Sequence, residues 1–191
     1  MKVLISGGCK NGKSTYAEKI ALALREAGTI CYYIATMKPM DEEDDQRISR
    51  HQESRKNLGF ETVEQQVDVA DLLDRCDNKG AFLLDSITAL LANEMFSFNG
   101  ETYVTDSAAP ERVIADLHQL MDGVDHIVMV SDYMYGDTAF YDDATEVYRQ
   151  GLAQVDQACA ANCDVVIEVC YGRLIVYKGQ DLMEELYEKI S

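Results

Sequence analysis

The chain has 191 residues, of which 17 are basic and 34 acidic, so its formal net charge is −17. Nucleic acids and anionic membranes are bound chiefly through Lys and Arg, so a chain this acidic is expected to bind neither. No stretch approaches the ~18 consecutive apolar residues of a membrane span, and the N-terminal apolar run is too short for a signal peptide. We therefore expect a cytoplasmic protein with one domain over residues 1–191.

A glycine-rich segment follows the first apolar run. Val3–Ser6 predicts a buried strand, and residues 7–14 read Gly-Gly-Cys-Lys-Asn-Gly-Lys-Ser. This fits the P-loop pattern G-x-x-x-x-G-K-[ST], with a strand before it and a helix predicted after it. A chance glycine-rich turn is the alternative, but all the fixed positions of the pattern are satisfied. The segment predicts that the protein binds a nucleoside triphosphate.

Each fixed position of this segment has a physical role. Gly7 and Gly12 can adopt backbone conformations that turn successive N–H groups toward phosphate oxygens. The helix predicted over Lys13–Ala27 presents its positive N-terminal end to the same anion. Lys13 can reach the β- and γ-phosphates as a catalytic residue, and the Ser14 hydroxyl can ligate Mg²⁺. The residues predicted to bind nucleotide here are Gly7, Gly8, Cys9, Lys10, Asn11, Gly12, Lys13 and Ser14.

Beyond this segment, short apolar strands alternate with amphipathic helices. The alternation predicts an α/β fold of the RecA-like P-loop NTPase class, with a mostly parallel sheet, helices on both faces and a C-terminal antiparallel hairpin. Gly28 suits the position just after the first helix, and residues 98–109 are predicted to be a loop. The predicted strands are residues 3–6, 30–36, 60–63, 81–85, 126–131, 165–169 and 174–177. The predicted helices are residues 13–27, 41–58, 67–76, 86–98, 110–122, 142–162 and 181–190.

An acidic residue ends the apolar strand predicted over residues 81–85. In a parallel sheet, ligands bind at the carboxyl ends of the strands. Asp85 is therefore predicted to hold Mg²⁺, directly or through water, beside Ser14. Taken alone the pattern is weak, because strands often end in Asp before a helix cap.

A histidine lies among three arginines in the helix predicted over residues 41–58. Arg47, Arg50 and Arg55 surround His51 in an otherwise acidic chain. Guanidinium groups suit phosphate oxygens, and a neutral imidazole can act as a nucleophile on phosphorus. From the residues alone, an exposed helical histidine among salt-bridge partners remains the alternative.

The six cysteines form no C-x-x-C pair and are interpreted as small buried side chains. Cys159 and Cys163 lie four residues apart on a predicted helix and could share a metal. No nearby histidine or second cysteine pair completes such a site, so packing is the simpler interpretation. His118 and His126 have no comparable surroundings and are predicted to be structural.

Several of these segments together resemble the bifunctional adenosylcobinamide kinase/adenosylcobinamide-phosphate guanylyltransferase family of cobalamin biosynthesis. The double glycine, followed by Ile-Ala-Thr and by Arg-Ile-x-x-His, is more specific than the P-loop alone. The segments that carry the resemblance are residues 5–14, Tyr33–Thr36, Asp45–His51, Phe60–Glu64 and Leu83–Thr88.

The resemblance implies two activities and an assembly. The first would move a phosphoryl group from ATP or GTP to the hydroxyl of adenosylcobinamide, and the second would transfer GMP from GTP to adenosylcobinamide phosphate. It implies that His51 is the residue that becomes guanylylated, and Arg47, Arg50 and Arg55 could steady the phosphates. It also implies a homotrimer, for which the apolar segment Met134–Tyr141 is a candidate contact surface.

The segment after the strand predicted over residues 126–131 departs from the family. There the family carries Asn-Glu-Val-Gly-x-Gly-Ile-Val-Pro, whereas Asp132–Phe140 reads Asp-Tyr-Met-Tyr-Gly-Asp-Thr-Ala-Phe. Because this loop follows the carboxyl end of a strand, we expect it to border the site. Two alternatives therefore stay open: a P-loop kinase with a different small acceptor, or a nucleotide-binding regulatory protein that has lost the transfer chemistry.

Overall fold

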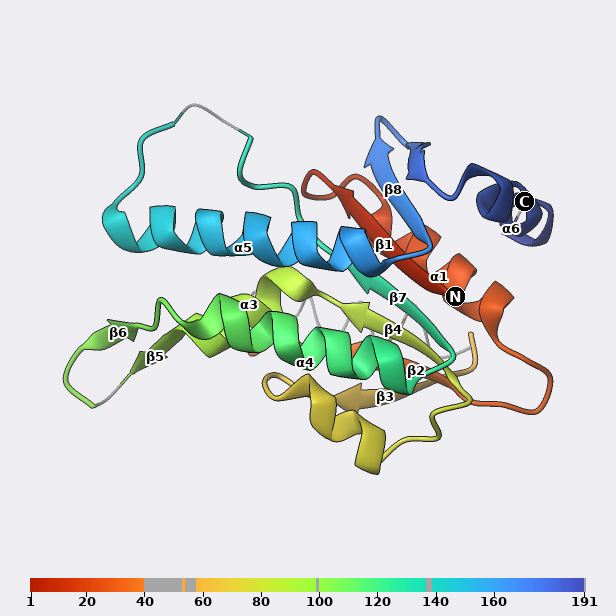
Figure 1. Ribbon diagram of the computed structural model, residues 1–191, viewed down its shortest axis with the longest axis horizontal. Coiled ribbons are helices and arrows are strands. Elements are labelled where there is room, and N and C mark those ends of the chain that lie inside the picture. The colour runs from red at the N-terminus through yellow and green to blue at the C-terminus, as the bar shows by residue number, and fades with distance from the viewer. Residues whose placement is uncertain (40–52, 54–57, 99, 137–138, 191) are drawn as a thin grey trace.

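The computed structural model describes residues 1–39, 53, 58–98, 100–136 and 139–190, and Figure 1 shows its ribbon. The strands of its main sheet are β1 (Lys2–Gly7), β2 (Cys31–Ala35), β3 (Phe60–Glu64), β4 (Ala81–Asp85), β7 (His126–Val130), β8 (Val165–Cys170) and β9 (Arg173–Lys178). A separate hairpin consists of β5 (Phe96–Phe98) and β6 (Tyr103–Thr105). The helices are α1 (Lys13–Leu24), α3 (Ile87–Met95), α4 (Ala109–Gly123), α5 (Asp143–Asn162) and α6 (Gln180–Ile190), with the 3-10 helix η1 (Val69–Asp74).

Among the described residues, seven strands form one sheet in the order β3-β2-β4-β7-β1-β8-β9. All neighbouring strands in it are parallel except β8 and β9, which pair antiparallel. Parallel strands need crossover connections, and the helices between them cover the sheet. The predicted mostly parallel sheet with a C-terminal antiparallel hairpin is therefore confirmed. Strand β7 lies between β1 and β4, so the segment that follows β7 lies next to the phosphate loop that follows β1.

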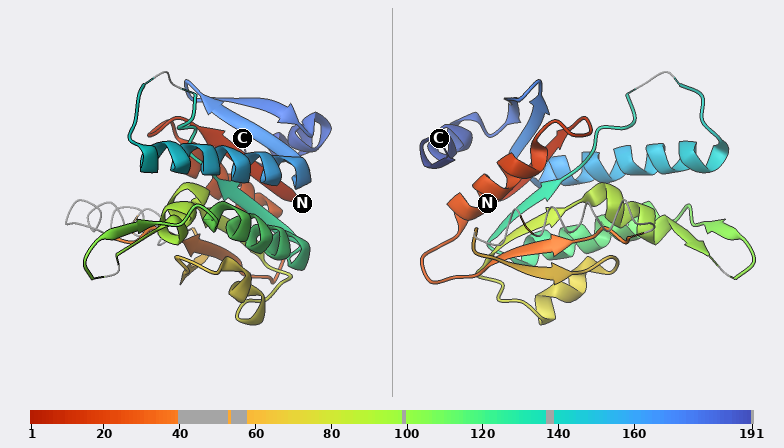
Figure 2. Two further views of the ribbon diagram at one scale, coloured as in Figure 1. Left: turned by 60° about the vertical axis from the view of Figure 1, so that its left-hand side comes forward. Right: turned by 180° about the vertical axis from the view of Figure 1, so that it is seen from behind.

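The two faces of the sheet are covered by different helices, as the views in Figure 2 show. Leu4, Phe82 and Met129 pack in a cluster with α3, α4 and α5, whereas Ile5 and Val128 pack with α1 and α6. Neighbouring residues of a strand point to opposite faces, so both faces of the central strands are apolar and buried. Each such side chain contributes roughly 1.5–3 kcal/mol when it leaves water. None of the helices in the described segments has the length and apolar composition needed to cross a membrane.

The first helix ends at Leu24, earlier than the predicted residue 27, and the next residue is extended (φ −63°, ψ 122°). Residues 25–28 are exposed, so a longer helix would bury no further apolar surface. The prediction that Gly28 directly follows the helix is wrong. Gly28 (φ 87°) instead lies in a turn closed by a hydrogen bond from the Thr29 N–H to the Glu26 carbonyl, at 3.1 Å.

The predicted loop over residues 98–109 is also wrong, because β5 and β6 pair antiparallel there. The predicted helix over residues 86–98 stops at Met95 for the same reason. Aromatic and β-branched residues dominate both strands and favour extended backbone over helix. In Figure 1 this hairpin lies at the left, beyond the end of α3 and apart from the main sheet. The helix predicted over residues 67–76 is the shorter η1.

All six cysteines lie in described segments and are free thiols. Three are buried as predicted, whereas Cys76 and Cys170 are only partly buried and Cys9, on the phosphate loop, is exposed. Burial raises the pKa of the Cys163 thiol to about 12 and also raises that of Cys159. Both thiols are thus buried as small apolar side chains, which agrees with a packing role.

Candidate nucleotide-binding site

The phosphate loop turns between the end of β1 and the start of α1. Gly7 (φ 150°), Lys10 (φ 56°) and Gly12 (φ 93°) all have positive φ angles, and Gly12 is the N-cap of α1. A Cβ on Gly7 would lie only 2.6 Å from the carbonyl oxygen of Val169 and 2.3 Å from the side chain of Asn11. Glycine is therefore required at this position. The turn brings together Gly7, Gly8, Cys9, Lys10, Asn11, Gly12, Lys13 and Ser14.

Asn11 fixes this loop against β8. Its Nδ2 donates to the Val169 carbonyl, and its Oδ1 accepts from the Lys13 backbone N–H at 3.2 Å. The same side chain thus joins the middle of the loop both to the sheet and to the first turn of α1. The contact holds the loop in shape before any phosphate arrives, which lowers the ordering cost of binding.

Lys13 is buried, with 6% of its side chain exposed, and its ammonium group is already paired. The Nζ atom donates to the Gly8 carbonyl at 2.7 Å and to Asp132 Oδ1 at 2.8 Å. Asp132 lies two residues beyond the end of β7, the neighbour of β1. The sequence predicts that the loop beginning at Asp132 borders the site, and Asp132 does contact the phosphate loop. The ion pair with Lys13 is not predicted, because it depends on β7 lying next to β1.

The backbone around Asp132 is held on both sides. The Asp132 N–H donates to Thr88 Oγ1 at 2.8 Å, and the next N–H, that of Tyr133, donates to the Gly7 carbonyl at 2.9 Å. One bond reaches α3 and the other reaches the start of the phosphate loop. The carboxylate of Asp132 is thus presented to Lys13 by a fixed backbone.

A second carboxylate, that of Asp156 on α5, lies buried behind this segment. Asp156 is 4% exposed, and its Oδ2 accepts hydrogen bonds from Ser131 Oγ and Tyr135 OH, both at 2.9 Å. Burial raises the pKa of Asp156 to about 6; its two hydrogen bonds oppose the shift, and the charge of Asp132 adds to it. Its Oδ1 atom and the hydroxyl of Ser6 are buried without partners among the described residues. Asp156 therefore holds Ser131 and Tyr135, which flank Asp132 in the sequence, although burying its ionised carboxylate is unfavourable.

Asp85 lies at the carboxyl end of β4, as predicted. The hydroxyl of Tyr33 donates to its Oδ2 at 2.8 Å, and Ser86 begins α3 by capping the Ala89 N–H at 3.2 Å. Ser14 is half-buried in the first turn of α1. Hydroxyl and carboxylate oxygens are the hard ligands that Mg²⁺ prefers, so this donor set fits the ion. Because β7 separates β4 from β1, the pairing of Ser14 with Asp85 at one ion stays a prediction.

The predicted nucleophile His51 lies outside the described residues, as do Arg47, Arg50 and Arg55. Most of the helix predicted over residues 41–58 lies outside them as well. The roles of these four residues therefore stay predictions.

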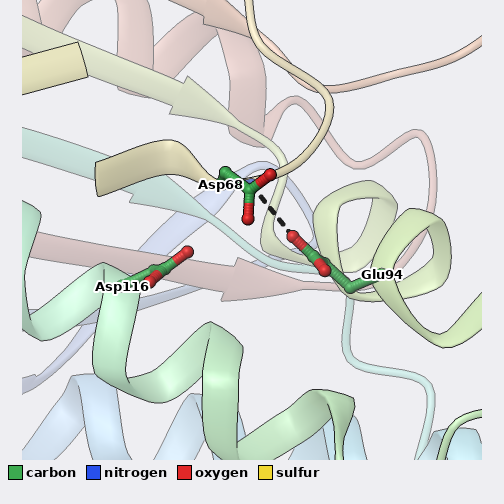
Figure 3. A group of neighbouring side chains, drawn as sticks. All are labelled: Asp68, Glu94 and Asp116. Atoms are coloured by element: carbon green, nitrogen blue, oxygen red, sulfur yellow. Dashed lines mark hydrogen bonds between the residues drawn. The ribbon is translucent and has the colours of Figure 1, made fainter. Parts of the chain in front are cut away.

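Three further carboxylates lie close to one another, as Figure 3 shows. Asp68 directly precedes η1, Glu94 lies in α3 and Asp116 lies in α4. One oxygen atom from each carboxylate lies within 4.8 Å of the other two. The Asp68 N–H donates to Glu94 Oε1 at 2.9 Å, and Arg112 lies 4.0 Å from the same carboxylate. These contacts offset part of the charge and give the cluster a structural explanation.

Comparison with solved structures bears on the fold of the chain. One solved ATPase domain matches with a TM-score of 0.53 at 11% identity, covering 94% of this chain and 77% of that one. At this identity the likeness bears on the fold alone. It agrees with the P-loop NTPase architecture predicted from the sequence.

Comparison with protein families is more specific. Residues 3–176 match the model described as cobinamide kinase / cobinamide phosphate guanyltransferase. A "Bifunctional adenosylcobalamin biosynthesis protein CobU" from Salmonella typhimurium is 33% identical over 125 residues, which is 63% of this chain and 66% of that protein. The protein of the same name from Escherichia coli is 31% identical over 53% of this chain and 54% of that protein.

A third relative aligns along its whole length. The "Bifunctional adenosylcobalamin biosynthesis protein CobP" from Pseudomonas aeruginosa is 27% identical over 95% of this chain and 100% of that protein. The chain thus spans somewhat under two thirds of the first relative, about half of the second and all of the third. Since the family model covers almost the whole sequence, the chain belongs to the cobinamide kinase / cobinamide phosphate guanyltransferase family.

Proposed function

We propose that this protein phosphorylates the hydroxyl of adenosylcobinamide with ATP or GTP and then transfers GMP from GTP to adenosylcobinamide phosphate. The observation that carries the proposal is the phosphate loop between β1 and α1, in a chain whose family match spans residues 3–176. The full-length alignment with CobP supports both activities, since that relative is named bifunctional. We expect the cytoplasm as the location.

In the first activity the loop binds the phosphates. Backbone N–H groups at the start of α1 face the anion, and Lys13 donates from its ammonium group to the transferring phosphoryl group. Ser14 and Asp85 would hold Mg²⁺, which neutralises phosphate charge when it is bound. The protein supplies position and positive charge where negative charge develops.

In the second activity His51 is the nucleophile. Its imidazole nitrogen forms a bond to the α-phosphorus of GTP as the bond from that phosphorus to the pyrophosphate oxygen breaks. The phosphate of adenosylcobinamide phosphate then attacks the same phosphorus and releases the histidine. Arg47, Arg50 and Arg55 steady the phosphates through both steps. A covalent intermediate divides one displacement into two easier ones.

Labelled GTP tests this proposal. The wild type incubated with α-labelled GTP and Mg²⁺ is expected to carry acid-labile label, and His51→Ala is expected to carry none. His118→Ala is the matched control, because His118 lies apart from the phosphate loop and contacts α5 through Asn162. An unlabelled wild type would contradict guanylyl transfer, and label persisting in His51→Ala would contradict the nucleophile.

We further propose a homotrimer, following the family resemblance. Met134 and Tyr141 are each 45% exposed and Phe140 is fully exposed, so the loop after β7 offers apolar surface to a second copy. Light scattering coupled to size-exclusion chromatography measures the mass of the particle directly. A monomer at micromolar concentration would contradict the proposal.

A kinase with a different small acceptor remains the second candidate. It is favoured by the composition of this same loop, in which Asp132 and Tyr133 contact the site and are not the family's residues. Stabilisation against heat by nucleotide with cobinamide supports the first function. Stabilisation by nucleotide with a non-corrinoid alcohol supports the second.

A further inference from the structure

The carboxylate of Asp132 has a fixed place beside the predicted phosphate site. Its Oδ1 atom lies 2.8 Å from Lys13 Nζ, and 28% of its side chain is exposed. Lys13 is the residue that reaches the β- and γ-phosphates in a loop of this pattern. A phosphate oxygen bound by Lys13 would therefore lie within two hydrogen-bond lengths of the Asp132 carboxylate, which is partly exposed to solvent.

A carboxylate in this place opposes the binding of an anion. It neutralises the cation that the phosphates need, in a chain that already carries a net charge of −17. Yet the backbone is anchored so that the carboxylate stays there, through Thr88 and through Gly7 at the start of the phosphate loop. The arrangement suits a group that takes part in the transfer itself.

Resting on the proposed kinase activity, we propose that Asp132 is the catalytic base that receives the proton of the acceptor hydroxyl. The hydroxyl oxygen forms a bond to the γ-phosphorus while the bond from that phosphorus to the β,γ-bridging oxygen breaks. The hydroxyl proton passes to the Asp132 carboxylate, and the nucleoside diphosphate leaves with the electron pair of the broken bond. Asp132 then returns the proton to solvent through its exposed side.

The geometry of the site is compatible with this role. A base must lie about 2.6–3.2 Å from the hydroxyl oxygen, and that oxygen about 3–3.5 Å from phosphorus. Both conditions can be met by one hydroxyl between Asp132 and a phosphate held on Lys13. Asp85, by contrast, lies one strand farther from β1 and accepts a hydrogen bond from Tyr33. We therefore assign Asp85 to the binding of Mg²⁺ and Asp132 to the acceptance of the hydroxyl proton.

The variant Asp132→Asn distinguishes a role of Asp132 as catalytic base from a purely structural role. We expect kcat for cobinamide phosphorylation to fall about 10²- to 10⁴-fold, the usual contribution of general base catalysis. Removing the competing charge should leave the Kd of the nucleotide unchanged or make it about fivefold tighter. Steady-state kinetics give kcat, and calorimetry gives Kd. The melting temperature reports whether the variant is folded.

Glu168→Gln is the matched control. Glu168 lies on β8 near the same edge of the sheet and accepts a hydrogen bond from Tyr177 at 2.6 Å, so this change removes one negative charge without touching Lys13. Its kcat should equal that of the wild type. Asp132→Ser, which also lacks a carboxylate, is the second variant and must show the same fall in kcat. An unchanged kcat in either Asp132 variant would overturn the inference, as would a fall in kcat matched by weaker nucleotide binding.

Failure of the proposed function has a different signature. If the wild type binds nucleotide but forms no cobinamide phosphate, the proposed acceptor is wrong. The base is then tested on the slow transfer of the γ-phosphoryl group to water, for which Asp132→Asn should show the same fall in rate. An equal rate of hydrolysis in the two proteins would overturn the inference independently of the acceptor.

Discussion

At the scale of single residues, the phosphate-loop lysine lies among three oxygen atoms of its own chain. Lys13 Nζ donates to the Gly8 carbonyl and to Asp132 Oδ1, and more weakly to Asn11 Oδ1 at 3.4 Å. A triphosphate must replace or share these contacts, so the affinity for nucleotide reflects the difference between the two sets of bonds. The loop pattern predicts the lysine and its role, but the pattern carries no information about Asp132.

Asp156 allows a prediction about stability and pH. Its pKa is about 6 in the native state against an ordinary value of 3.8, so the folded protein keeps a proton that the unfolded chain loses. The stability of the wild type therefore falls as pH rises through the window from about 4 to about 6. We expect Asp156→Asn, which keeps the shape and an acceptor, to remove this fall and to raise the free energy of unfolding by up to about 3 kcal/mol at pH 7.

Urea unfolding of the two proteins at pH 4.5 and pH 7 measures this difference. The gain should be large at pH 7 and small at pH 4.5. A variant less stable than the wild type at pH 7 would contradict the prediction, and would mean that Ser131 and Tyr135 need the charged acceptor.

At the scale of elements, the carboxylate cluster links η1, α3 and α4. Burial and the neighbouring charges of Asp68 and Glu94 raise the pKa of Asp116. A raised pKa means that the folded protein favours the protonated form of Asp116. The stability that this form contributes is lost as the pH rises and the group ionises. We expect Asp116→Asn to raise the free energy of unfolding by roughly 0.5 kcal/mol at pH 7, as removal of like-charge repulsion does on helices.

The control for this prediction is Glu111→Gln, an exposed position in the first turn of the same helix. Its charge interacts favourably with the helix dipole, so its loss should lower the free energy of unfolding slightly and not raise it. Chemical denaturation at pH 7 measures both variants. If Asp116→Asn is destabilising instead, the cluster holds a cation that the wild type needs. Added EDTA would then destabilise the wild type to the same extent.

Among the described residues, the order of the main strands and helices was predicted correctly, but one hairpin and the end of one helix were not. Strand and helix order followed from the alternation of apolar and polar residues, which is a local signal. The β5–β6 hairpin was missed although its sequence contains Asn99-Gly100, a dipeptide typical of hairpin turns between aromatic and β-branched residues. The predicted end of α1 at residue 27 was wrong because where a helix stops depends on whether further turns bury apolar surface.

At the scale of the whole molecule, charge is the dominant feature. A net charge of −17 destabilises the compact state by self-repulsion, which salt screens. Raising the salt from 0.1 M to 1 M shortens the screening length from about 10 Å to about 3 Å. We expect the melting temperature at pH 7 to rise over this range, as measured by calorimetry.

A matched measurement near the isoelectric point, at a sequence pI of about 4.4, serves as the control. There the net charge is close to zero, so the same salt should have much less effect. A melting temperature that falls with salt at pH 7 would show that attractive ion pairs, such as Lys13–Asp132, outweigh the repulsion.

The sequence by itself determined the class of fold, the phosphate loop and the acidic residue that ends β4, because these depend on local patterns of glycine, lysine and apolar residues. Which carboxylate reaches Lys13 was decided only by the tertiary structure. Strand order is fixed by packing between segments far apart in the chain, and that packing inserts β7 between β1 and β4. Asp132, 119 residues from Lys13, therefore becomes its ion-pair partner. The position of Asp132 after a strand predicts only that its loop borders the site, and the ion pair with Lys13 depends on the strand order.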